Sequence, residues 1–124
     1  MIIVDANVIL RYLLQDIEEL FGKAVKVIED EDIYIPNEVM AEVVYVLEKV
    51  YKVDREDIEK TLMSLISYTN IKVDNKDLIK TALQLFSVRR LDFVDTLLFA
   101  YNKVEDYEVI TFDRKLNKVI ERNK

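Results

Sequence analysis

The chain opens with MIIVDANVILRYLL (residues 1–14), and this stretch decides the class of fold that we expect. Residues 1–4 form a short, continuous apolar run, which is typical of a strand buried in a parallel sheet. Asp5 follows at once, and apolar residues then recur at helical spacing from Val8 onward. In an open parallel sheet, ligands bind beyond the carboxyl ends of the strands. The opening therefore predicts a buried strand, an acidic residue at its carboxyl end and a helix.

Short apolar runs and helical segments continue to alternate along the rest of the chain. This alternation indicates an α/β fold with a parallel sheet that helices cover on both faces. The long stretch between the second and third strands has room for two helices, so we expect more helix than strand. Further strands are predicted at residues 33–35, 71–73 and 109–112. Further helices are predicted over residues 17–28, 37–51 and 54–68, from 74 or 75 to about 89, over 93–104, and after 113.

The composition limits both the domain count and the chemistry. With 124 residues, 51% of them hydrophobic, and with one Gly and one Pro, the chain has enough apolar surface for a core. No linker or repeat interrupts it, so we expect a single domain over residues 1–124. The chain has no Cys and no His, which excludes disulfides, thiolate zinc sites and Ser–His or Cys–His nucleophiles. Any catalysis must use carboxylates, hydroxyls, amines or hard cations.

The location and the charge lead to two further expectations. No apolar run reaches the roughly 18 to 20 residues of a membrane span, and the opening lacks the basic residues of a signal peptide. We therefore expect a cytoplasmic protein without a membrane partner. The net charge of −6 argues against a nucleic-acid binder, although residues 114–124 carry five basic residues and one acidic residue. Candidates for phosphate contacts, each more often a solvated surface charge when taken alone, are Arg11, Arg89, Arg90, Arg114 and Lys115.

Two acidic residues stand directly after predicted strands. Asp5 follows the first strand and Asp113 follows the last, so both belong at the carboxyl edge of the sheet. Each could instead be a helix cap, a position that Asp favours. Glu42 lies about 40° from Val46 around its helix, at the border of the apolar stripe. Taken alone, Glu42 is better explained as a solvated surface residue.

Asp95 is the most informative acidic residue because it lies within the apolar stretch LDFVDTLLFA (residues 91–100). Asp is a poor helix former and is rarely left unpaired near buried surface. No Lys or Arg stands one helical turn away, and Lys103 comes eight residues later. We therefore favour a functional role for Asp95, and the structural role of helix N-cap for Asp92.

Convergence of Asp5, Glu42, Asp95 and Asp113 would require a cation. Two unit charges about 4 Å apart repel by roughly 4 kcal/mol at an effective dielectric of 20. Ligand sets made only of oxygen select Mg²⁺ or Mn²⁺, and such ions can activate water for phosphodiester hydrolysis. Asn7 and Thr111 can hydrogen-bond to water or phosphate there, although a helix cap and a strand residue are the ordinary explanations.

The order of four motifs resembles that of PIN domains. VDANV (residues 4–8) resembles the opening of that family, and AEV (residues 41–43), after Pro36, resembles its second motif. DFVDTLL (residues 92–98) resembles the third motif and TFD (residues 111–113) the fourth, so the likeness runs from end to end. Ala6 departs from the Thr or Ser that is common at its position. Thr96 and Phe99 replace a more usual alanine and a smaller residue.

The resemblance implies a fold, an activity and partners. The implied fold is a three-layer α/β/α sandwich with a central parallel sheet. The implied activity is Mg²⁺- or Mn²⁺-dependent cleavage of single-stranded RNA, and small members are often VapC-like toxins. Such toxins commonly form homodimers and are silenced by a small antitoxin protein. The implied metal ligands are Asp5, Glu42, Asp95 and, as the more variable fourth acid, Asp113.

Other functions stay open at this point. The chain could be a non-catalytic PIN-like module that binds RNA or a protein. A metal-dependent phosphatase with an Asp nucleophile usually has Asp-x-Asp after the first strand, where this chain has Asn7. A phosphoacceptor receiver domain would need a Lys after the last strand. Retention of all four acids favours the nuclease.

Overall fold

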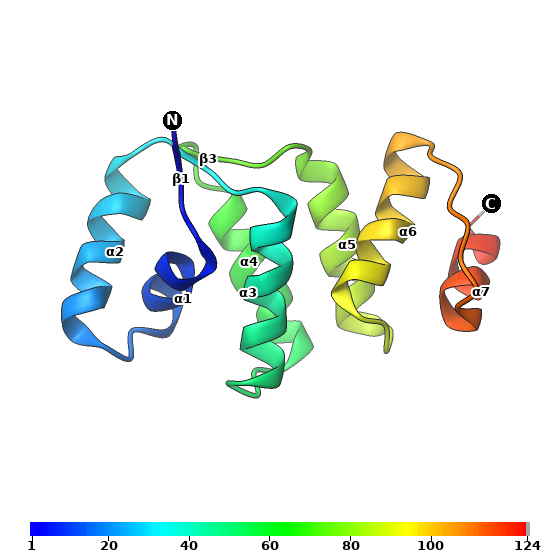
Figure 1. Cartoon of the computed structure of the whole chain (residues 1–124), viewed down its shortest axis with the longest axis horizontal. Helices are drawn as coiled ribbons and strands as arrows, with labels where there is room; N and C mark the ends of the chain where they lie inside the picture. The colour runs from blue at the N-terminus through cyan, green and yellow to red at the C-terminus, as the bar shows by residue number, and fades with distance from the viewer. Residues whose placement is uncertain (124) are drawn as a thin grey trace. The chain divides into compact units, whose positions relative to one another are not determined.

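The computed structural model describes residues 1–123 and divides them into two compact units (Figure 1). The first unit is Met1–Asp74, and the second starts at Asn75. The single domain that the sequence predicts stays a prediction.

The first unit contains a parallel sheet of three short strands in the order β1-β2-β3. The register places Ile33 between Ile2 on one side and Ile71 on the other. Ile33 and Ile71 are buried, as expected for apolar runs in a covered parallel sheet. The predicted parallel sheet is confirmed for its first three strands: β1 (Ile2–Ile3), β2 (Ile33–Tyr34) and β3 (Ile71–Lys72). The predicted burial of the first strand is wrong, because Ile2 and Ile3 in β1 are exposed.

Two helices separate each pair of successive strands in the first unit. Their apolar stripes supply the core, in which Ile9, Ile28, Met40 and Leu62 have no exposed surface. Helix thus exceeds strand, as predicted from the length of the segment between β2 and β3. The helices are α1 (Ala6–Leu14), α2 (Glu18–Asp30), α3 (Asn37–Lys49) and α4 (Arg55–Ile66).

The second unit consists of α5 (Lys76–Val88), α6 (Phe93–Glu105) and α7 (Arg114–Arg122), which follow one another as neighbouring helices (Figure 1). The rings of Phe86 and Phe93 meet edge to face between α5 and α6, with centroids 5.8 Å apart. A cluster of buried side chains joins α6 to α7, and it consists of Leu91, Phe99, Leu116, Val119 and Ile120.

The predicted last strand at residues 109–112 is wrong, because the segment has no strand conformation. Val109, Ile110 and Phe112 have high strand propensity, but a strand exists only where a neighbouring strand supplies its hydrogen bonds. Here, side chains from the flanking helices bind the carbonyl groups of this connection. The Asn102 amide donates to the carbonyl of Tyr107 at 2.7 Å, and the Asn117 amide donates to the carbonyl of Thr111 at 2.8 Å. The connection is therefore held to α6 and α7 as an irregular segment.

The predicted α/β class, with a parallel sheet and an excess of helix, is confirmed. In the described part of the chain, no helix is long and apolar enough to cross a membrane.

Candidate functional site

Asp95 lies in the first turn of α6, and its side chain is half-buried. Burial is the main cause that raises the pKa of Asp95, and the negative charges of Asp113 and then of Asp92 raise it further. Both causes penalise the ionised carboxylate, and none of the ion pairs formed among the described residues involves Asp95. A cation bound at Asp95 would relieve that penalty.

Asp113 is the N-cap of α7 and is exposed. Its Oδ1 accepts a hydrogen bond from the Leu116 amide at 2.8 Å. Its own amide donates to Thr111 Oγ1 at 3.0 Å. Thr111, predicted to bind water or phosphate, thus fixes the backbone of Asp113. The capping explanation holds for Asp113, and its other carboxylate oxygen is not used by the cap.

Asp92 occupies the N-cap position of α6, as predicted, but its side chain makes no capping hydrogen bond. Asp92 therefore occupies the N-cap position without capping the helix through its side chain. Its negative charge acts on Asp95 instead, and so Asp92 belongs to the acidic surroundings of that residue.

Asp5 and Glu42 belong to the first unit. Asp5 is exposed, caps α1 and accepts a hydrogen bond from the Val8 amide at 3.1 Å. Glu42 lies on α3, a helix that packs against α1, and its side chain is exposed. The capping explanation thus also holds for Asp5.

Of the four predicted metal ligands, Asp5 and Glu42 belong to the first unit, and Asp95 and Asp113 belong to the second. Within the second unit, Asp95 and Asp113 lie near enough for the charge of one to act on the other. Among the residues that the structure describes, no three His, Cys, Asp or Glu side chains form a group that could hold a metal ion. The convergence of all four carboxylates therefore stays a prediction.

Arg11, a predicted phosphate contact, is held by partners in its own unit. Its Nη1 lies 2.9 Å from both carboxylate oxygens of Asp16, and its Nη2 donates to the Tyr51 hydroxyl at 3.1 Å. These bonds, that of Tyr51 first, raise the pKa of Arg11 against the opposing effect of burial. Phosphate would have to compete with Asp16 for this guanidinium. The other residues that the sequence predicts to contact phosphate or water, and that are exposed, are Asn7, Arg89, Arg90, Arg114 and Lys115.

A hydroxyl network in the first unit was not expected from the sequence. Tyr12 donates to Glu29 Oε2 at 3.0 Å, and its hydroxyl lies 3.1 Å from that of Tyr68. Burial is the main cause that raises the pKa of Tyr12, and the hydrogen bonds to Tyr68 and Glu29 add to it. The three side chains line a cavity of about 460 Å³ between α1, α2 and α4. No sequence signal links them, because Tyr12 and Tyr68 are 56 positions apart.

Comparison with known proteins identifies the family of the chain. The sequence model of the PIN domain matches residues 2–121, a range that contains all four acids. A VapC ribonuclease from Aquifex aeolicus (strain VF5) is 31% identical over 124 residues, covering 94% of this chain and 90% of that protein. No solved structure matches the chain. With the parallel sheet, the match confirms the PIN-like α/β/α class that the sequence predicts. The chain therefore belongs to the PIN-domain family.

Proposed function

We propose that this protein is an endoribonuclease that cleaves single-stranded RNA with the help of Mg²⁺ or Mn²⁺. The observation that carries the proposal is the half-buried Asp95, whose ionised form is opposed by burial and by two neighbouring carboxylates. Perturbed carboxylates of this kind are concentrated at functional sites. Membership of the PIN family and the relative named as a VapC ribonuclease support the same activity.

The ligands that we propose for the metal are Asp5, Glu42, Asp95 and Asp113. The donor chemistry fits, because a chain without His or Cys offers only oxygen ligands, which hard divalent cations prefer. Two of these acids, Asp95 and Asp113, lie near enough for the charge of one to act on the other. A divalent ion held there supplies Lewis-acid chemistry for phosphodiester hydrolysis.

The residues of the chain have separate tasks in this proposal. Asp5 and Asp113 hold their carboxylates at helix N-termini through hydrogen bonds to Val8 and Leu116. Thr111 holds Asp113 in place, and Asn7 is the candidate hydrogen-bond donor to water or phosphate. Arg114, the first residue of α7, is exposed beside Asp113 and is the nearest candidate in sequence for a phosphate contact. Arg11 is the second candidate.

We further propose that the protein is the toxin of a VapBC-type toxin–antitoxin pair. In this proposal it acts in the cytoplasm as a homodimer and is silenced by a small antitoxin protein. The likeness to the VapC ribonuclease of Aquifex aeolicus supports this assignment. The second candidate function is a non-catalytic PIN-like module that binds RNA or a protein. The excess of acidic over basic residues, 24 against 18, favours that second candidate.

Cleavage of defined single-stranded RNAs by the purified protein tests the enzymatic proposal. We expect cleavage with Mn²⁺ and none with EDTA. Asp5→Asn and Asp95→Asn should each lower the rate on the order of 100-fold or more, because each removes a charged metal ligand. Asp106→Asn is the matched control, since Asp106 ends the same helix as Asp95 in a left-handed conformation (φ 62°) that Asn also tolerates.

The result contradicts the proposal if Asp95→Asn, with a wild-type circular dichroism spectrum, cleaves RNA at the wild-type rate. RNA binding without cleavage by the wild type would instead support the non-catalytic module.

A further inference from the structure

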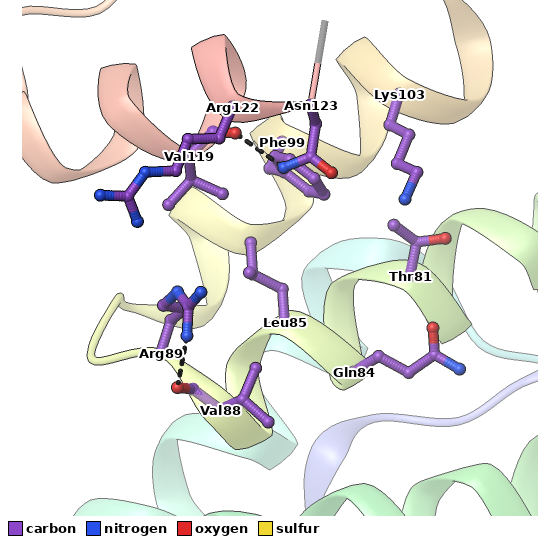
Figure 2. Close-up of a pocket in the computed structure, with 10 residues that line it drawn as sticks. All are labelled: Thr81, Gln84, Leu85, Val88, Arg89, Phe99, Lys103, Val119, Arg122 and Asn123. Atoms are coloured by element: carbon purple, nitrogen blue, oxygen red, sulfur yellow. Dashed lines mark hydrogen bonds between the residues drawn. The ribbon is translucent and has the colours of Figure 1, made fainter.

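A pocket in the second unit lies outside the proposed carboxylate site. It has a volume of about 300 Å³ and lies between α5, α6 and α7 (Figure 2). That volume is at the lower end of the range for small-molecule pockets. Among the residues that the structure describes, no Asp or Glu lines it, although the whole chain is acidic. We call this site the basic pocket, after its lining cations Arg89, Lys103 and Arg122.

These three cations stand at two opposite sides of the basic pocket. In Figure 2, Arg89 and Arg122 lie on one side and Lys103 lies on the other. Lys103 and Arg122 form no ion pair with a carboxylate of the described residues. Arg89 donates a hydrogen bond of 3.4 Å to the carbonyl of Val88, which is one of its interactions in the structure. The charges of Lys103 and Arg122 are therefore available to an anion from solution.

The surface between the cations is apolar. Leu85 lies between the two sides in Figure 2, and Phe99 and Val119 form the buried wall beside it. The Nζ of Lys103 lies 5.9 Å from the centre of the Phe99 ring, which holds the ammonium group at the edge of this surface. A ligand that fills the pocket must therefore join anionic ends through an apolar middle.

Uncharged polar groups add hydrogen-bonding capacity at the rim. Thr81 and Gln84 lie on the side of Lys103 (Figure 2). The Asn123 amide nitrogen donates to the carbonyl of Val119 at 2.9 Å, so its oxygen remains as an acceptor. Hydroxyl and amide groups of this kind pair with sugar hydroxyls and with base edges.

The charge distribution along the chain also singles out the second unit. Residues 75–124 carry ten basic and eight acidic side chains, whereas residues 1–74 carry eight basic and sixteen acidic ones. The overall charge of −6 therefore arises in the first unit. A polyanion is attracted to the second unit rather than to the first.

We propose that the basic pocket binds one internal nucleotide of single-stranded RNA. One flanking phosphate binds Arg89 and Arg122, the other binds Lys103, and the base or sugar covers Leu85 and Phe99. This inference rests on the proposed function, because it gives the RNA substrate a second contact beyond the carboxylates. The pocket anchors RNA and takes no part in cleavage.

Titration calorimetry in EDTA tests the inference without cleavage. The probes are inorganic phosphate, uridine 3′,5′-bisphosphate and a short oligouridylate. We expect the bisphosphate to bind more tightly than inorganic phosphate, because its two phosphates can reach both cationic sides and a single phosphate cannot. We expect the oligouridylate to bind most tightly, since its neighbouring phosphates add to the attraction. A bisphosphate that binds as tightly as the oligouridylate would assign the pocket to a free nucleotide and overturn the RNA assignment.

Two substitutions probe the cations, and a third is their control. Arg122→Gln and Lys103→Gln should each weaken oligouridylate binding about tenfold. Each should also flatten the plot of log K against log salt by about 0.7, the loss of one phosphate contact with a single strand. Lys118→Gln removes the same charge from α7 at an exposed position that does not line the pocket. It should leave the salt dependence unchanged.

Three further results would overturn the inference. Equal losses in Arg122→Gln and Lys118→Gln would show attraction to a diffuse basic surface. Equal affinities for phosphate and bisphosphate would show that the apolar middle is not used. No binding of any probe would exclude the site. RNA cleavage with Mn²⁺ is measured on the same variants, so loss of the pocket and loss of the nuclease activity are told apart.

Discussion

At the scale of single residues, burial and the negative charges of Asp113 and Asp92 raise the pKa of Asp95. An acid with a raised pKa in the folded state binds its proton more tightly there than in the unfolded chain. Its ionisation therefore lowers stability as pH rises through the raised folded pKa. Below the ordinary value of 3.8, both states are protonated and the penalty is absent.

Asp95→Asn should consequently stabilise the metal-free protein at neutral pH. The advantage over the wild type should shrink as pH falls toward the ordinary pKa of aspartate. Urea unfolding in EDTA across this range measures the effect, and Glu108→Gln, an exposed site in the connection after α6, is the control. A lower stability of Asp95→Asn at neutral pH would mean that the carboxylate has a favourable partner.

The half-buried setting of Asp95 could be inferred from sequence because its neighbours in the chain are also its neighbours in space. Residues 91–100 form the start of one helix, so an apolar stretch of sequence becomes an apolar surface. The hydrogen bond of Arg11 to Tyr51 could not be inferred in this way. Tyr51 is 40 positions further along the chain, and no local pattern indicates which residue approaches it.

At the scale of helices and strands, two of the proposed metal ligands also begin helices. Asp113 accepts the hydrogen bond of the Leu116 amide, and Asp5 accepts that of Val8. The negative charge of each also interacts favourably with the positive end of its helix. Capping and metal binding are compatible, because a carboxylate has two oxygens.

Substitutions at Asp113 should separate these two roles. Asp113→Ala removes the cap and should lower the free energy of unfolding by about 1 kcal/mol. Asp113→Asn keeps a capping oxygen and should unfold close to the wild type while losing a charged metal ligand. Urea denaturation in EDTA gives both values. Equal destabilisation by Ala and Asn would show that the charge, rather than the cap, stabilises α7.

The positions of the helices could be predicted from the sequence more reliably than the conformation of residues 109–112, the last apolar run. Helical hydrogen bonds are local, so the spacing of apolar residues predicts α1 to α7 directly. A strand needs a partner strand from elsewhere in the chain. Residues 109–112 have a high strand propensity but do not adopt strand conformation. The N-cap at Asp113 was still correctly placed, because the helix after it defines that position.

At the scale of the whole molecule, the proposal concerns four acids that lie far apart in the sequence. The sequence gives the order of the four acids and the family match covers them, but neither contains the distances between their oxygens. Those distances depend on long-range packing rather than on local spacing. Metal binding offers a thermodynamic readout of their convergence.

Mn²⁺ should raise the melting temperature of the wild type. At about 100 times its Kd, a ligand specific for the folded state adds about 2.7 kcal/mol, or roughly 10 °C for a domain of this size. Scanning calorimetry should show a much smaller rise for Asp95→Asn, and a wild-type rise for Asp106→Asn. Equal rises in all three proteins would mean that the ion binds elsewhere.

The central claim is that Asp5, Glu42, Asp95 and Asp113 share a divalent cation. The most direct measurement is the anomalous scattering of Mn²⁺ in a crystal of the protein grown with that ion. We predict a peak with carboxylate oxygens of these residues at about 2.0–2.3 Å, the usual range for such ions. An ordered crystal with Mn²⁺ in solution, in which the four carboxylates lie on separate surfaces and hold no shared ion, would contradict it.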